Sequence, residues 1–237
     1  MRHRQMLRSP FVITCWFILI ASLAVGAGRS DDRDKKPEQA GDLPLAYEDD
    51  FERDQGTGWD FTDKSAWRNK RIDDGHKHVL EQYQASKYQP AVRSPLNIAL
   101  LQGHDLGDFV LDLQARSTTQ DIGHRDICLF FGHQDASHFY YVHLAKEADD
   151  VHNSIFLVNG KPRVSIAEKR TKGTPWTDGW HHVRVVRTVK DGLIQVYFDD
   201  MKSPTMSAHD QTFTHGRLGV GSFDDTGMFD EIRIWGK

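Results

Sequence analysis

Six polar residues that could act together fall in three separate stretches of the sequence. His124, Arg125 and Asp126 follow one another, Tyr141 and His143 flank one valine, and Arg184 comes later in the chain. A tyrosine, a histidine and an arginine could serve an elimination reaction as base, acid and neutraliser of a carboxylate. The same side chains could instead bind a sugar, through an aromatic ring and planar hydrogen-bond donors, without any reaction. A purely structural hydrogen-bonded network is the third interpretation.

Alternation along the second of these stretches indicates which side chains share a face. Val142 and Leu144 are aliphatic and suit the core, which leaves Tyr141 and His143 on the opposite face of the strand. Arg184 lies between two valines in the same way. We therefore expect one polar, ligand-binding face made of His124, Arg125, Asp126, Tyr141, His143 and Arg184, bordered by a polar loop that carries His152. In the catalytic alternative, the reacting groups are His143, Tyr141 and His124.

The segments that must position these residues have the pattern of β-strands. Residues 109–115 alternate with period two, and 127–131 and 139–144 are apolar runs of strand length. Asp191-Gly192 separates two further runs and is a strong hairpin signal. No convincing helical periodicity follows the N-terminal region, so we predict an all-β fold, an antiparallel β-sandwich. Cys128 falls inside an apolar run and is expected to be buried and inert.

The overall composition is that of an ordinary globular protein. Of the 237 residues, 38% are hydrophobic and 27% are charged, which excludes a wholly disordered chain and a multispan membrane protein. The 30 basic and 34 acidic residues give a net charge of −4, which offers no basic surface for nucleic acid. Only 2 cysteines are present, so a disulfide framework is excluded.

The N-terminal region has the pattern of a secretory signal peptide. Arg2, Arg4 and Arg8 precede an apolar run over 11–25, and small residues follow up to Ala27. The run is shorter than the about 20 apolar residues that a spanning helix needs. We predict a signal peptide over 1–27, a charged and disordered linker over 28–42 and one domain over 43–237. The protein is then secreted or periplasmic, with no membrane span after cleavage.

Three stretches resemble the concanavalin A-like lectin/glucanase superfamily, and in particular its laminin-G-like members. They are Trp180-His181-His182-Val183-Arg184-Val185 with Asp191-Gly192 and 196–199, then 131–135 with 139–141, and finally 216–221 with 229–234. The opening residues 47–51 and Gly58-Trp59 resemble the first strand of secreted sandwich domains, some of which are 3-keto-glycoside lyase/hydratase-like proteins. The resemblance implies a concanavalin A-like jelly roll. It does not choose among the lectins, glycosidases, lyases and adhesion modules that share this fold.

The resemblance also implies a function and a metal. It implies a secreted carbohydrate-binding or adhesion module of laminin-G or lectin type, whose partner is a glycan or polysaccharide. The alternative is a carbohydrate-active enzyme, a polysaccharide lyase or a 3-keto-glycoside hydrolase. In similar secreted domains a structural Ca²⁺ often joins the first and last strands, which makes Asp50 and Asp230 the expected ligands. The acidic turn at Asp224 and Asp225 offers further oxygen ligands, and no other cofactor is expected.

Histidine spacing gives no indication of a zinc site. The sequence has 13 histidines but no His-Glu-x-x-His or Cys-x-x-Cys pattern, the spacings that many zinc sites show. The adjacent His181 and His182 point to opposite faces of a strand and cannot chelate together. We therefore expect the histidines on loops and sheet surfaces.

Overall fold

The computed structural model describes residue 1, residues 35–53 and residues 58–237. The predicted signal peptide beyond Met1 and the first part of the predicted linker lie outside the described residues. The compact unit that contains the strands covers Pro37–Lys237. Glu38–Ala40 forms a 3₁₀ turn, η1, whose Ala40 is 1% exposed and packs beside Val110. No helix in the described part of the chain is long and apolar enough to cross a membrane.

Almost all regular secondary structure in the described chain is β-strand, as the alternation predicts. The elements that follow η1 are β1 (Leu45–Asp49), β2 (Trp59–Phe61), η2 (Lys64–Ala66), β3 (Trp67–Arg71), β4 (His78–Gln82), β5 (Asn97–Leu101), β6 (Phe109–Ser117), β7 (Asp126–Asp135), β8 (His138–Ala145), β9 (Ser154–Asn159), β10 (Val164–Ser165), β11 (Lys169–Arg170), β12 (His181–Thr188), β13 (Leu193–Phe198), β14 (Met206–His209), β15 (Arg217–Ser222) and β16 (Gly227–Gly236).

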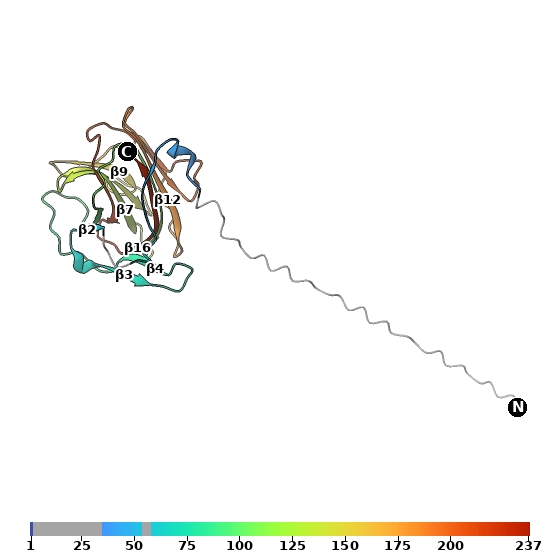
Figure 1. Cartoon of the computed structure of the whole chain (residues 1–237). Coiled ribbons are helices and arrows are strands. Elements are labelled where there is room, and N and C mark those ends of the chain that lie inside the picture. Colours follow the sequence, from blue (N-terminus) through green and yellow to red (C-terminus); the bar gives the residue numbers. More distant parts are fainter. Residues whose placement is uncertain (2–34, 54–57) are drawn as a thin grey trace. The chain divides into compact units, whose positions relative to one another are not determined.

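These strands form two antiparallel sheets that pack as a sandwich (Figure 1). Within the described residues, a 9-stranded sheet has the order β11-β14-β13-β12-β6-β16-β4-β3, with β1 paired to β16. A 7-stranded sheet has the order β10-β9-β8-β7-β15-β5-β2. The predicted fold class, an all-β antiparallel β-sandwich, is confirmed.

The core between the sheets is filled by alternate residues of each strand. Tyr140, Val142 and Leu144 of β8 enter it from the seven-stranded sheet. Val183 and Val185 of β12 enter it from the nine-stranded sheet. All of these side chains are 0% exposed. The assignment of Val142 and Leu144 to the core is therefore confirmed.

The outward face of the seven-stranded sheet is covered rather than open to solvent. It carries a second apolar cluster that includes Cys128, Tyr141 and Phe156, each at most 1% exposed. Val92, from the segment between β4 and β5, and Phe223, which follows β15, pack against this cluster. The expectation that Cys128 is buried is confirmed.

The strands at the ends of the two sheets are short. Each of β10 and β11 has 2 residues, β2 has 3 and β3 has 5. The residues of β11 are Lys169 and Arg170, and β3 ends in Lys70 and Arg71. The end strands of the nine-stranded sheet, β11 and β3, therefore combine little unpaired backbone with basic side chains.

Candidate functional site

A polar hollow of about 200 Å³ lies on the outward face of the seven-stranded sheet. Its lining consists of Arg93, His124, Asp126, His143, His152, Arg163, Phe223 and Asp224. Asp126 and His143 are buried and form the floor, whereas Arg93, His124 and Asp224 are exposed at the rim. Two arginines face two aspartates in this lining, so the hollow has no strong excess of either charge.

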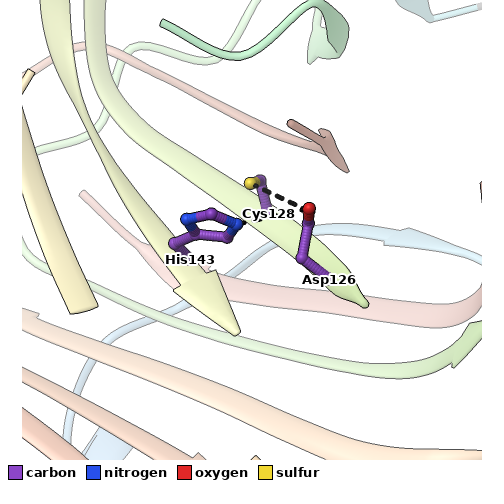
Figure 2. A group of neighbouring side chains, drawn as sticks. All are labelled: Asp126, Cys128 and His143. Carbon is purple, nitrogen blue, oxygen red and sulfur yellow. Dashed lines mark hydrogen bonds and ion pairs between the residues drawn. The ribbon is translucent and has the colours of Figure 1, made fainter. Parts of the chain in front are cut away.

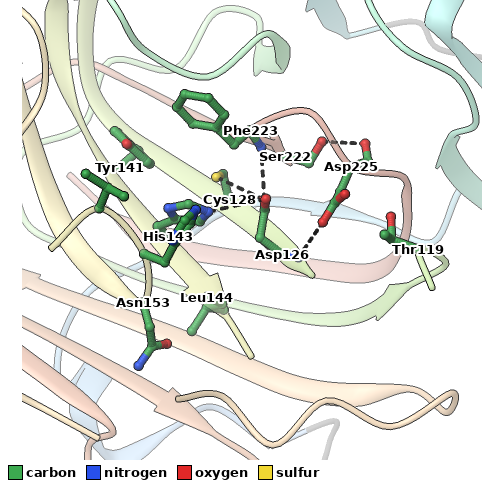
Figure 3. Close-up of polar contacts among 12 residues, drawn as sticks. Thr119, Asp126, Cys128, Tyr141, His143, Leu144, Asn153, Ser222, Phe223 and Asp225 are labelled. Atoms are coloured by element: carbon green, nitrogen blue, oxygen red, sulfur yellow. Dashed lines mark hydrogen bonds and ion pairs between the residues drawn. The ribbon is translucent and has the colours of Figure 1, made fainter. Parts of the chain in front are cut away.

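The floor is built by two neighbouring strands and one turn. Asp126 begins β7, and His143 lies on β8 directly opposite Cys128 (Figure 2). The Oδ1 atom of Asp126 accepts a hydrogen bond from the backbone N–H of Phe223 at 2.9 Å and lies 3.6 Å from Cys128 Sγ. The backbone N–H of Asp126 donates to Asp225 Oδ2 at 2.7 Å (Figure 3). The carboxylate of Asp126 is therefore held in one position.

His143 is a buried polar side chain without a hydrogen bond. It is 1% exposed, and neither of its ring nitrogens has a hydrogen-bond partner among the described residues. Its Nε2 lies 3.3 Å from Asp126 Oδ2, but the angles at this contact are not those of a hydrogen bond. The ring stacks on Phe223 with centroids 5.8 Å apart. Because buried polar groups nearly always have partners, His143 marks the floor as a place where a ligand would gain hydrogen bonds or coordination.

Arg163 forms one wall of the hollow, and Tyr141 holds it there. Arg163 Nη1 donates to Tyr141 Oη at 3.1 Å and Nη2 donates to Val151 O at 3.0 Å. The guanidinium also lies 4.1 Å above the centre of the Phe223 ring. Burial raises the pKa of Tyr141 well above its usual value, so its hydroxyl stays neutral. Tyr141 shares the predicted face but is completely buried beneath Arg163, which corrects the expectation that its ring contacts the ligand.

Arg125, which we predicted on the same face, lies on the other side of its strand. It is 2% exposed, and its Nη2 donates to Ser117 O at 2.8 Å and Thr177 O at 2.9 Å. Because successive side chains of an extended chain point in opposite directions, Arg125 and Asp126 cannot face the same way. Arg125 therefore belongs to the internal hydrogen bonding of the domain and not to the hollow.

Arg184 is also separated from the hollow, because its strand belongs to the other sheet. In β12 of the nine-stranded sheet, Arg184 Nε donates to Asp112 Oδ2 at 2.7 Å and Nη1 donates to Gln39 Oε1 at 3.1 Å. The alternation that places Arg184 opposite the core valines is correct, but each sheet of a sandwich has its own outward face. The predicted face is thus reduced to Asp126, Tyr141 and His143, with His124 at the exposed rim.

Asp50 and Asp230, the expected calcium ligands, do not form one ligand cluster. The first and last strands are neighbours as expected, with Asp49 opposite Ile232. However, β16 has an irregular register after Asp230, and the carboxylate of Asp230 is bound to His76. Among the described residues, Asp230 forms with His76 and Glu231 a group of side chains that could together hold a metal ion, whereas Asp50 belongs to no such group of three.

Several residues of the hollow lie in segments without periodicity. The polar loop with His152 does border the hollow, as the sequence indicates. The sequence analysis missed Arg93, Arg163 and Phe223, which lie outside the regular strands. No local pattern distinguishes these arginines from other exposed basic residues. They could be found only by knowing which loops cover the seven-stranded sheet.

Asp225, which holds the backbone of Asp126, has a strongly shifted pKa. Burial and then the charge of Asp126 raise the pKa of Asp225 from 3.8 to about 6. The folded state therefore binds this proton more tightly than the unfolded state does. Above about pH 6 the charged Asp225 carboxylate lowers the free energy of unfolding. This destabilisation disappears as the pH falls below 3.8, the pKa of the carboxyl in the unfolded chain.

We expect Asp225→Asn to stabilise the protein in a pH-dependent way. The free energy of unfolding should rise by about 1 kcal/mol at pH 7.5 and by about a third of that at pH 4.5, because the amide oxygen still accepts the N–H of Asp126. Urea unfolding at both pH values measures this difference. The exposed Asp150→Asn change is the control. A stabilisation that is equal or larger at pH 4.5 would contradict the raised pKa.

Comparison with known proteins bears on the fold. No family model matches the chain, and no curated protein matches it. Among solved structures, the carbohydrate-binding module CBM66 from Bacillus subtilis matches with a TM-score of 0.53 at 18% identity, covering 76% of this chain and 96% of the module. This chain has a lectin/glucanase-like jelly-roll fold.

Two further structures have the same architecture. The carbohydrate recognition domain of Emp47p matches with a TM-score of 0.50 at 14% identity, over 82% of this chain and 94% of that domain. The GH43 protein BlXynB from Bacillus licheniformis matches with a TM-score of 0.52 at 12% identity, over 80% of this chain and 39% of that protein. At these identities the likeness shows the fold alone.

Proposed function

We propose that the protein binds a carbohydrate in the hollow above Asp126 and His143. The observation that carries this proposal is the buried His143 at the floor of the hollow, whose ring nitrogens have no hydrogen-bond partner among the described residues. The hollow around it is lined by planar donors and acceptors. Sugar hydroxyls both donate and accept hydrogen bonds, and arginine, histidine and aspartate offer partners for both roles. The proposal agrees with the names of proteins with this fold, a carbohydrate-binding module and a carbohydrate recognition domain.

The size of the hollow favours a single sugar ring. Its volume of about 200 Å³ is below the about 300–1,000 Å³ of sites that enclose drug-sized ligands. A neighbouring ring would then lie over the rim, where Arg93, His124 and Asp224 are accessible. We infer that the floor and walls select one ring and that the rim adds contacts to the next.

His152 is a hydrogen-bonding side chain that is already oriented for binding. Its Nδ1 lies 2.8 Å from Asp149 Oδ2, and its backbone N–H donates to Asp149 Oδ1 at 2.7 Å. These contacts fix the ring and leave Nε2 for a ligand. Because a fixed side chain loses little entropy on binding, such preorganisation increases affinity.

The arrangement supports binding better than elimination. A catalytic base must reach the substrate and accept its proton. Tyr141 lies beneath Arg163, and burial keeps its hydroxyl protonated. We therefore propose binding rather than catalysis as the activity of this hollow. We also propose that the protein is an exported, laminin-G-like module, which rests on the N-terminal pattern and on the motifs of the sequence.

The proposal is tested by glycan-array screening and then by calorimetric titration of the full chain with the best glycan. Replacing His152 by alanine or Asp224 by asparagine should each weaken binding about tenfold, because one hydrogen-bond partner is worth roughly 1–1.5 kcal/mol. The melting temperature should change little, since both residues lie at the wall or rim.

The matched control is His209→Ala on β14 of the other sheet, where the exposed imidazole lies 2.9 Å from Glu168. This variant should bind like the wild type. If glycan binding survives both changes in the hollow but is lost in Arg184→Ala, the binding face is on the nine-stranded sheet and the proposed site is wrong.

A further inference from the structure

We propose that Asp126, Cys128 and His143 bind a zinc ion at the floor of the hollow. One ligand atom from each of these residues lies within 4.8 Å of the other two (Figure 2). A thiolate, an imidazole and a carboxylate are the ligand types that Zn²⁺ takes in proteins. This inference concerns a metal and does not depend on the proposed glycan.

The strand pairing brings these ligands together. Asp126 and Cys128 are alternate residues of β7 and share its outward face, and Cys128 lies directly opposite His143 of β8. This explains why the sequence shows no zinc motif: two ligands come from one strand with a single residue between them, and the third comes from the neighbouring strand. Backbone hydrogen bonds of the sheet therefore fix all of the ligand-bearing positions.

The spacing of the ligand atoms fits a tetrahedral ion. With metal–ligand bonds of about 2.0–2.3 Å, neighbouring ligands of a tetrahedral zinc lie roughly 3.3–3.8 Å apart. Oδ1 of Asp126 lies 3.6 Å from Cys128 Sγ, its Oδ2 lies 3.3 Å from His143 Nε2, and one ligand atom of each residue lies within 4.8 Å of the other two. Small side-chain rotations would therefore suffice for coordination, with no change in strand register.

The unpartnered imidazole of His143 is the independent observation that points to a ligand. Its nitrogens are buried and make no hydrogen bond among the described residues, although Asp126 lies beside them. Coordination through Nε2 would give this nitrogen a partner. The Phe223 N–H that binds Asp126 Oδ1 would then orient the metal-bound carboxylate, as outer groups do in known metal sites.

The charges of the ligands and the access to the site fit a zinc ion with three protein ligands and one open coordination position. The Asp126 carboxylate and the Cys128 thiolate would neutralise the two charges of Zn²⁺, and binding releases the thiol proton. Three protein ligands leave a fourth position for water or for an oxygen of a ligand. Because Asp126 and His143 line the hollow, this position faces it.

A second cluster shares one residue with this site. Asp126, Asp224 and Asp225 also have carboxylate oxygens within 4.8 Å of one another. An all-oxygen set suits Ca²⁺ rather than Zn²⁺, but among the described residues none of its carboxylates is a buried group without a hydrogen-bond partner, as His143 is. Binding of the metal ion by this oxygen cluster is therefore the alternative that the experiment below must distinguish.

The test is titration of the chelator-treated full chain with Co²⁺ alone, which reports a thiolate ligand by a charge-transfer band in the near ultraviolet. We expect one Co²⁺ per chain with this band in the wild type and in Cys15→Ser. The band should disappear in Cys128→Ser, and affinity should fall at least tenfold in His143→Gln. Zn²⁺ should displace the Co²⁺. The Asp224→Asn variant should bind Co²⁺ with the affinity of the wild type.

Two results would overturn the proposal. One is a natively folded wild type, checked by circular dichroism, that shows no thiolate band with excess Co²⁺. The other is metal binding that is lost in Asp224→Asn but retained in Cys128→Ser, which would assign the ion to the oxygen cluster. If Cys128→Ser does not fold, X-ray absorption of the zinc-loaded wild type decides, since the proposal requires one sulfur ligand. No glycan is present in these measurements, so their failure is distinct from failure of the carbohydrate proposal.

Discussion

The change Gly221→Ala should abolish the folded domain. A Cβ atom at this position would lie 1.8 Å from Asn97 O and 3.2 Å from the Phe130 ring. Gly221 belongs to β15, which pairs with β5 on one side and β7 on the other. Since the clash is with backbone of β5, the two strands would have to separate. We expect a loss of more than about 4 kcal/mol in the free energy of unfolding, the range reached only by severe defects.

Circular dichroism and thermal melting of the purified variant measure this effect. Gly179→Ala is the matched control, because its nearest contact would be Thr177 Oγ1 at 3.4 Å, an ordinary separation. The control should melt close to the wild type. A Gly221→Ala protein that melts within a few degrees of the wild type would show that β15 and β5 are not packed as closely as described.

The change Arg125→Met should strongly destabilise the protein without acting through the binding site. The guanidinium donates to the carbonyl oxygens of Ser117 and Thr177, and the side chain is 2% exposed. Methionine retains most of the apolar stem but leaves these carbonyls without their charged donor. We expect a cost of about 2–4 kcal/mol, since hydrogen bonds from charged donors contribute about 1.5–3 kcal/mol each. The melting temperature should fall by about 5–15 °C.

Arg71→Met is the control for this prediction, because Arg71 is exposed at the end of β3. It should change stability by less than about 0.5 kcal/mol. Below its melting temperature, Arg125→Met should retain the glycan affinity of the wild type. An Arg125→Met variant that keeps its stability but loses glycan binding would contradict this prediction and would support the original placement of Arg125 on the binding face.

The local features of the fold could be predicted from the sequence because they depend on near neighbours in the chain. Alternation placed Val142 and Leu144 in the core, and both are completely buried. The turn at Asp191-Gly192 connects β12 and β13, and Gly192 has a φ of 76°, which favours glycine. Burial of Cys128 followed from its apolar run in the same way.

The composition of the site could be predicted only in part, because it depends on contacts between distant segments. Alternation shows whether a residue faces inward or outward, but not to which sheet its strand belongs, so Arg184 was grouped with His143 across the sandwich. Arg125 was placed on the wrong face because the sequence does not show where β7 begins. With the strand beginning at Asp126, the side chain of Asp126 points outward and that of the preceding Arg125 points the other way. Arg93 and Arg163 reach the hollow from loops, and no periodicity describes how loops cover a sheet.

The short basic strands at the ends of the nine-stranded sheet affect how copies of the protein behave at high concentration. Edge-to-edge pairing of two chains would bring Lys169 and Arg170 of β11, or Arg71 of β3, close to the same residues of another copy. These like charges repel, although the whole chain has a net charge of −4. Because exposed charges are screened over about 8–10 Å at moderate salt, high ionic strength would weaken this protection against aggregation. Solubility at high concentration should therefore depend on salt through the edges of the sheets, while the core remains unaffected.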